Sequence, residues 1–157
     1  MACTSAPSEG PCVPDPKRHG DPRVARVVTL FEGLVPADLP RLDAVYADDV
    51  RFEDPFNEVT GLAELRAIFL HMFASIETPR FTVRDIAAEG DQAFLTWDFD
   101  FSSRGRAMQI RGASHLRFGA DGRVVLHRDY WDAAEELYEK LPLIGTLMRW
   151  LRRRATR

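Results

Sequence analysis

The stretch Tyr46-Ala-Asp-Asp-Val-Arg-Phe-Glu-Asp-Pro-Phe56 decides how this chain is interpreted. From Arg51 to Phe56 apolar and charged residues alternate, and a period of two is typical of a half-buried strand. Phe52, Asp54 and Phe56 would then share the buried face. A carboxylate buried without a partner is poised to take up a proton, so Asp54 is a candidate general base. An equal alternative is that Asp54 caps a turn, because Asp-Pro commonly opens turns.

Length and composition indicate one soluble globular domain. The chain has 157 residues, of which 45% are hydrophobic and 29% are charged, and this length suffices for a sizeable core. Its net charge of −3 gives no basic footprint, so we expect no nucleic-acid partner. Cys3 and Cys12 show neither disulfide nor metal-site spacing, and the start lacks the apolar segment of a signal peptide. We therefore expect a cytoplasmic protein without a metal or a cofactor.

The chain divides into three parts. Residues 1–21 are rich in proline, glycine and serine and are expected to be a disordered tail. Residues 22–133 form the expected α+β domain. Residues 134–157 form an expected amphipathic, basic C-terminal helical extension. We expect this extension to pack on the body or to close the mouth of the fold, and the alternative is a weak contact with an anionic membrane surface.

Within the domain the apolar periodicity changes from helical to alternating. Helical spacing predicts a helix that opens at Asp21-Pro22, a short helix over about residues 37–47, and a helix between Gly61 and Pro79. Alternation after Pro79 predicts an antiparallel meander of four strands. These strands are expected from Phe81 onward and over Ala93–Phe101, Ala107–Phe118 and Arg123–Trp131. Helices gathered on one face of an antiparallel sheet define the α+β class.

These segments resemble SnoaL-like and ketosteroid isomerase-like proteins of the nuclear transport factor 2-like superfamily. The resemblance lies in the stretch from Tyr46 to Phe56, in Arg117-Phe118 with Asp121-Gly122-Arg123, and in Tyr130-Trp131. It implies a conical, barrel-like fold in which a strongly curved, mostly antiparallel sheet wraps around three helices and a deep pocket. It also implies a homodimer, and it places Asp54 on the position of the catalytic base of the isomerase.

The oxyanion donors of the isomerase are absent from the matching positions. Aligned without gaps, its oxyanion tyrosine falls on Leu30, its protonated aspartic acid on Ser114, and the supporting tyrosine on Phe69. Removing one oxyanion donor raises a barrier by about 2.7–4 kcal/mol. Steroid isomerisation itself is therefore not expected.

Alternation along the strands identifies the residues expected to face the pocket. His127 and Asp129 stand two apart on the face that carries Trp131, so they should be neighbours. With Asp54 they form the candidate catalytic acid/base set, and the alternative is that they merely pair with each other or with an arginine. The candidate substrate-binding residues are Phe52, Phe56, Ile68, Phe69, Trp97, Phe99, Phe101, Ile110, Ser114 and Trp131.

Three kinds of function remain open from the sequence. The first is a cofactor-independent isomerase, cyclase or dehydratase acting on a small apolar carbonyl compound. The second is a non-catalytic module that binds a hydrophobic small molecule or lipid, and the third is an interaction protein that recruits a partner to the outer sheet face. The retained base position, Asp54, favours the enzyme, whereas the absent oxyanion donors favour the binding module.

Overall fold

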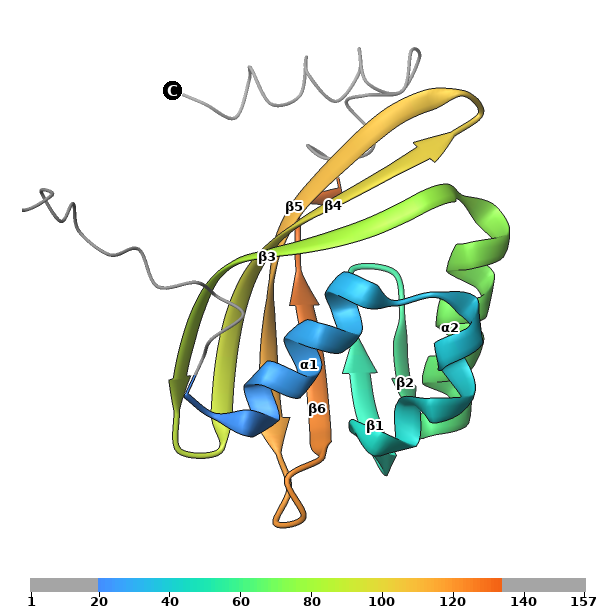
Figure 1. Cartoon of the computed structure of the whole chain (residues 1–157). Coiled ribbons are helices and arrows are strands. Elements are labelled where there is room, and N and C mark those ends of the chain that lie inside the picture. Colours follow the sequence, from blue (N-terminus) through green and yellow to red (C-terminus); the bar gives the residue numbers. More distant parts are fainter. Residues whose placement is uncertain (1–19, 134–157) are drawn as a thin grey trace, which may run out of the picture.

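The computed structural model describes residues 20–133. Most of the expected N-terminal tail and the whole expected C-terminal helical extension, residues 134–157, lie outside the described residues. A curved sheet carries the helices on one side, which is the α+β arrangement expected (Figure 1). The elements are α1 (Pro22–Gly33), η2 (Pro36–Ala44), β1 (Tyr46–Glu53), β2 (Glu58–Thr60), α2 (Leu62–Ser75), β3 (Glu77–Glu89), β4 (Gln92–Ser103), β5 (Arg106–Phe118) and β6 (Val124–Tyr130).

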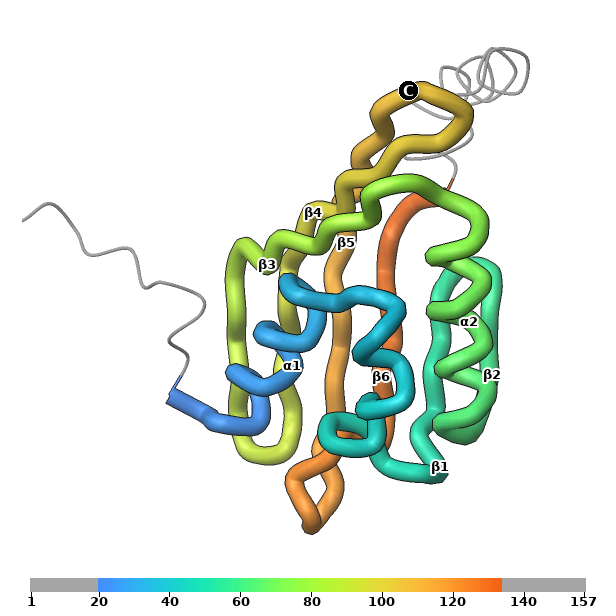
Figure 2. The backbone as a smooth tube through the Cα atoms, turned by 45° about the vertical axis from the view of Figure 1, so that its right-hand side comes forward, coloured from blue at the N-terminus to red at the C-terminus, as the bar shows by residue number. Residues whose placement is uncertain are grey.

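The six strands form one sheet in the order β2-β1-β6-β5-β4-β3. Neighbouring strands run antiparallel, except that β1 and β6 pair in parallel. The pairing of β3 with β4 shifts its register at two places, and such bulges bend a sheet. The long strands β3, β4 and β5 accordingly curve over α1, and the start of β3 lies above the helices (Figures 1 and 2).

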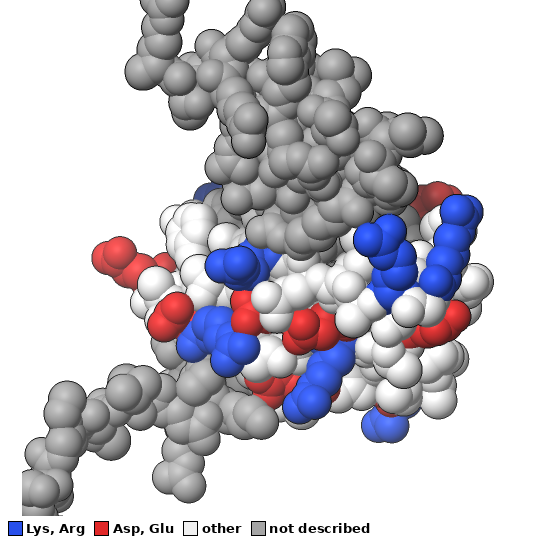
Figure 3. Space-filling view, turned by 90° about the horizontal axis from the view of Figure 1, so that it is seen from above, with Lys and Arg blue, Asp and Glu red and all other residues white. Residues whose placement is uncertain are grey.

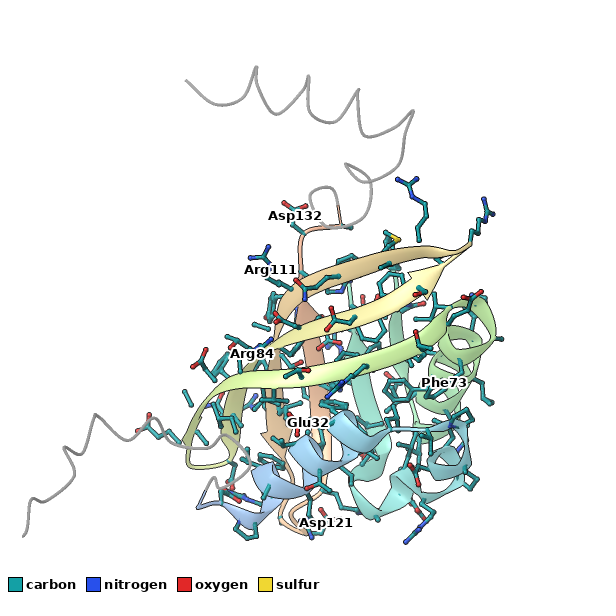
Figure 4. The ribbon with its side chains drawn as sticks, turned by 45° about the horizontal axis from the view of Figure 1, so that its top comes forward. Glu32, Phe73, Arg84, Arg111, Asp121 and Asp132 are labelled. Carbon is teal, nitrogen blue, oxygen red and sulfur yellow. The ribbon has the colours of Figure 1, made fainter. Side chains whose placement is uncertain are left out.

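Helix α1 begins at Asp21, whose side chain accepts the backbone N–H of Arg23 at 2.8 Å. An aspartate at this position with proline at the first helical position is a strong start signal. The apolar stripe that includes Val24, Val27 and Phe31 is buried, and α1 packs against β3. Glu32, near the end of α1, accepts the backbone N–H of Val83 on β3, and Figure 4 shows it between the two elements.

The segment predicted as a helix over about residues 37–47 forms a 3-10 helix followed by the start of a strand. A 3-10 helix occupies Pro36–Ala44, with Pro40 inside it, and a proline there removes a backbone donor that an α-helix needs. Tyr46 instead belongs to β1, where it pairs with Val124 of β6. The long-range pairing of two strands therefore overrides the helical spacing of the sequence.

Two further boundaries differ from the sequence predictions. Strand β2 was not predicted, because three residues are too few to show alternation. Strand β3 begins at Glu77, before Pro79 rather than after it. The register of β3 shifts between Glu77 and Arg80, and Thr78 has a φ of 50°, so Pro79 lies at an irregularity where a missing donor is tolerated.

Candidate functional site

A cavity of about 400 Å³ lies between the curved sheet and α2. Its wall combines side chains of β1, α2 and the strands β3 to β6 with the turn after β1. Asp54 and Asp129 both border it. The other sequence-predicted residues in its wall are Phe52, Phe56, Ile68, Phe69, Trp97, Phe99, Phe101, Ile110 and Trp131. Ser114 and His127 are not in the wall, because both are buried behind it, with 1% and 2% exposure.

Several wall residues were not assigned to the site from the sequence. They are Asn57, His71, Met72, Ile76, Phe81, Ser103 and Met108. Phe81 stacks on Phe99 with ring centroids 4.2 Å apart, and these two residues are direct partners in the β3–β4 pairing. Alternation in the sequence of β3 indicated that Phe81 faces one side of the sheet. The pairing with β4 that brings Phe81 to the cavity could not be predicted from that sequence.

Asp54 lies in the turn between β1 and β2. The prediction that it shares a strand face with Phe52 and Phe56 is wrong, because β1 ends at Glu53. Its Oδ1 accepts the backbone N–H groups of Phe56 and Asn57, both at 2.7 Å, and the Asn57 side-chain amide lies 3.0 Å from each carboxylate oxygen. Aspartate commonly organises turns in this way. The turn leaves Phe56 53% exposed, although it still borders the cavity.

A chain of hydrogen bonds runs behind the cavity wall from β4 to β1. Trp97 Nε1 donates to Ser114 Oγ at 2.8 Å, and Ser114 Oγ donates to Asp129 Oδ1. His127 Nε2 lies 2.8 Å from the same Asp129 oxygen, and Tyr46 Oη lies 2.9 Å from His127 Nδ1. His127 and Asp129 therefore pair, and the pair is part of a larger network that includes Tyr46.

These hydrogen bonds determine which tautomer neutral His127 adopts. The Asp129 carboxylate can only accept, so Nε2 of His127 carries the hydrogen and donates it. Nδ1 is then the acceptor for the hydroxyl of Tyr46. Burial raises the pKa of the Tyr46 phenol well above its usual value of 10.0, and the negative charge of Asp129 adds to the rise. The hydroxyl of Tyr46 thus stays a donor at neutral pH.

Asp129 lies where two hollows of the surface meet. Its side chain is 17% exposed, and it borders both the cavity and a second hollow. Among residues 20–133, the hydrogen bonds to Asp129 from Ser114 and His127 both end on Oδ1. Oδ2 takes part in neither of these two bonds.

The family of the chain follows from comparison with known proteins. Residues 27–127 match the SnoaL-like domain, which is well over half of the chain. The chain belongs to the SnoaL-like family. No curated protein matches the chain.

Solved structures share the fold of this SnoaL-like domain. An NTF2-like protein of unknown function from Burkholderia pseudomallei K96243 is 24% identical, with a TM-score of 0.65 over 72% of this chain and 92% of that one. A putative SnoaL-like polyketide cyclase from Jannaschia sp. CCS1 is 17% identical, with a TM-score of 0.64 over 72% and 87%. A protein with a ketosteroid isomerase-like fold from Catenulispora acidiphila DSM 44928, in complex with trimethylamine, is 19% identical, with a TM-score of 0.63 over 74% and 89%. These likenesses show the NTF2-like fold.

A second hollow of about 560 Å³ adjoins the SnoaL-like cavity, and their shared border is called the cavity mouth. Both spaces share Asp54, Asp129 and Trp131. Trp131 meets Phe56 edge to face, with ring centroids 5.2 Å apart, so an aromatic pair borders the junction. Asp132 also lines this hollow, at the end of β6 opposite to Asp121 (Figure 4).

The described part of the SnoaL-like domain offers no metal centre or membrane span. Over residues 20–133, no group of three or more histidine, cysteine or acidic side chains could hold a metal ion. No helix in this range is long and apolar enough to cross a membrane. Where described residues form the face seen from above, basic and acidic side chains are interspersed (Figure 3).

Proposed function

We propose that this SnoaL-like protein is a cofactor-independent acid/base enzyme, an isomerase, cyclase or dehydratase that acts on a small apolar carbonyl compound. The observation that carries the proposal is the placement of Asp129. Ser114 and His127 hold its Oδ1, and the side chain borders a mostly apolar cavity. A carboxylate fixed in this way beside a bound substrate can remove a proton from it.

In this proposal Asp129 is the proton acceptor and His127 is a positioning residue. His127 lies behind the wall, so it acts on a substrate only through its bond to Asp129. The proton that Asp129 takes from one substrate atom is returned to another, so an isomerisation or ring closure needs no oxidant or cofactor. Both oxygens of Asp54 accept N–H groups of its own turn, and we therefore propose that Asp54 orients the substrate and Asp129 does the proton transfer.

The proposal is tested with nitrobenzisoxazole, whose ring opening needs only a base. The base removes the ring C–H proton, the carbon–nitrogen triple bond forms, and the N–O bond breaks to release a coloured phenolate. We expect saturable turnover that Asp129→Asn lowers at least about 100-fold, while Asp54→Asn lowers it much less. A folded Asp129→Asn variant with the turnover of the original protein would reject the proposal, as would the absence of saturable turnover.

A binding module without chemistry is the second candidate. The observation that favours it is the complete pairing of Trp97, Ser114 and His127, because a satisfied buried network also serves structure alone. The Catenulispora neighbour was solved with trimethylamine, which supports small-molecule binding by proteins of this fold. This candidate predicts that apolar ligands bind equally well to Asp129→Asn and that no ring opening occurs.

We also propose a homodimer that forms through the outer face of the sheet. On that face Phe94 is 50% exposed and stacks on His115, with ring centroids 4.4 Å apart. Sedimentation should give a dimer that Phe94→Glu converts to a monomer, and a monomeric original protein would contradict this proposal. A cytoplasmic location and a weak membrane-surface contact through residues 134–157 stay predictions from the sequence.

A further inference from the structure

Among residues 20–133, the charged side chains that line the cavity are carboxylates. Asp54 and Asp129 line it, and its wall has no lysine or arginine among the described residues. Its other titratable side chain is His71, whose Nε2 lies 3.3 Å from Ser75 Oγ on the same helix. An anionic ligand would therefore meet two like charges, which repel it.

The hollow at the mouth is also bordered by several carboxylates. Among the described residues it is bordered by the carboxylates of Glu53, Asp54, Asp129 and Asp132 and by the guanidinium of Arg128, and Glu53 also pairs with Arg51 at 2.7 Å. Arg128 Nε is already paired with Glu53 Oε2 at 3.1 Å, and the guanidinium lies over the ring of Tyr130.

The cavity wall is also strongly aromatic. Eight phenylalanine and tryptophan side chains line it. Phe56 and Trp131 meet edge to face at the junction with the mouth, and the backbone N–H of Phe56 is bonded to Asp54 at 2.7 Å. The faces of such rings carry partial negative charge and attract cations. Carboxylates and aromatic faces at one place are the two groups that best recognise an ammonium ion.

We propose that the ligand of this cavity carries a cationic nitrogen on an apolar body, and that Asp54 with the Phe56–Trp131 pair binds this nitrogen at the mouth. The inference deepens the proposed function and rests on it for the use of the cavity as the substrate site. Oδ2 of Asp54 accepts one N–H group, from Asn57, so it keeps capacity for a donor from the ligand. The substrate class becomes an amine-bearing carbonyl compound, with Asp54 as the anchor and Asp129 as the base.

Three probes with the same apolar body test the sign of the charge. They are para-tert-butylbenzylamine, which is protonated at neutral pH, the neutral para-tert-butylbenzyl alcohol and the anionic para-tert-butylbenzoate. Calorimetry with the full chain should show the amine binding at least about tenfold more tightly than the alcohol, and the benzoate binding most weakly. An amine that binds no more tightly than the alcohol, or a benzoate that binds most tightly, would overturn the inference.

Two variants and a control locate the anchor. Asp54→Asn should abolish the preference for the amine over the alcohol and leave the affinity for the alcohol unchanged, and Phe56→Leu, at an exposed position, should reduce that preference. Asp49→Asn is the control, because Asp49 is an exposed carboxylate on β1 that does not line the cavity. An equal loss of preference in Asp49→Asn would overturn the assignment of the anchor.

The two proposals fail in different ways. If the amine preference holds but the ring opening of nitrobenzisoxazole does not depend on Asp129, the acid/base enzyme is rejected and the ligand class stands. If ring opening depends on Asp129 but the alcohol binds as tightly as the amine, the ligand class alone is rejected.

Discussion

Two carboxylates border the same cavity, yet different parts of the chain hold them. The partners of Asp54 lie within three residues of it, in the turn between β1 and β2. Asp129 is held by Ser114 on the neighbouring strand and by His127, which in turn bonds Tyr46, 81 residues away in the sequence. The orientation of Asp54 is thus a local property of the chain, whereas that of Asp129 depends on the register of β1, β5 and β6. We therefore expect changes around Asp129 to be costly and changes around Asp54 to be mild.

The largest effect is expected from His127→Leu. The change leaves the hydroxyl of Tyr46, which is completely buried, without its acceptor, and it removes one donor from Asp129. A buried polar group left unpaired costs about 1–3 kcal/mol, so we expect the free energy of unfolding to fall by about 3 kcal/mol. Urea denaturation followed by circular dichroism measures it. If His127→Leu lowered the free energy of unfolding by less than Asn57→Ala in the Asp54 turn, the contrast between the two carboxylates would be contradicted.

The next effect tests the far end of the same network through Gly112→Ala. Gly112 faces Trp97 in the β4–β5 pairing, and an added Cβ would lie 2.5 Å from Cζ2 of that indole. The indole must move, which disturbs its bond to Ser114, and overpacking of this kind costs about 1–3 kcal/mol. Denaturation midpoints and the rate of nitrobenzisoxazole opening should both fall.

Gly33→Ala is the matched control for this variant. Gly33 ends α1, and an added Cβ there meets nothing within 4 Å. Because alanine restricts the unfolded chain, this change should leave stability equal or raise it by up to about 1 kcal/mol. If Gly112→Ala and Gly33→Ala destabilised the protein equally, the close approach of Gly112 to the indole of Trp97 would not explain the effect of Gly112→Ala.

A smaller effect is expected from Tyr46→Phe, and it depends on pH. At neutral pH the variant leaves Nδ1 of His127 without its donor, so we expect a loss of about 1 kcal/mol. Nitrogen NMR of the imidazole should show the hydrogen on Nε2 in the original protein and a mixture of tautomers in the variant. An unchanged tautomer would contradict the positioning role of Tyr46.

At alkaline pH, the raised pKa of Tyr46 makes the stability of the protein depend on pH. Burial raises the pKa of Tyr46 above its usual 10.0, so above pH 10 the unfolded chain loses this proton while the folded protein keeps it. The contribution of Tyr46 to the free energy of unfolding is therefore fully present below pH 10. It decreases as the pH rises beyond 10, by about 1.4 kcal/mol per pH unit. Tyr46→Phe should lack this part of the decline. Parallel stability curves for the two proteins above pH 10 would contradict the raised pKa.

Periodicity of the sequence predicted much of the fold, and one of its failures has a long-range cause. The alternation of β4 and β5 gave those strands to within two residues, and the apolar stripe of α2 gave its start, although the helix ends at Ser75 and not at Pro79. The segment at Tyr46 failed because parallel pairing with β6 decides its structure. Such pairing joins residues far apart in the chain, and no local pattern encodes it.

The candidate site divides in the same way. Alternation placed His127 and Asp129 on one face, where they now form a hydrogen-bonded pair. Tyr46 was not assigned to the site, because its contact with His127 requires the β1–β6 register. The turn at Asp54 was foreseen only as an alternative. Its signal was local, since Asn57, three residues after Asp54, supplies the amide that completes the turn.

The smallest effect is expected from Asn57→Ala in that turn. The variant removes the amide that lies 3.0 Å from both oxygens of Asp54, but the backbone N–H groups of Phe56 and Asn57 remain at 2.7 Å. Because these two donors belong to the backbone, alanine at position 57 keeps both of them, and we expect a loss of only about 0.5 kcal/mol. Urea denaturation measures the loss, and the rate of nitrobenzisoxazole opening should not change. A destabilisation as large as that of His127→Leu would mean that the Asp54 turn depends on its side chains, and the contrast between a local and a long-range carboxylate would then fail.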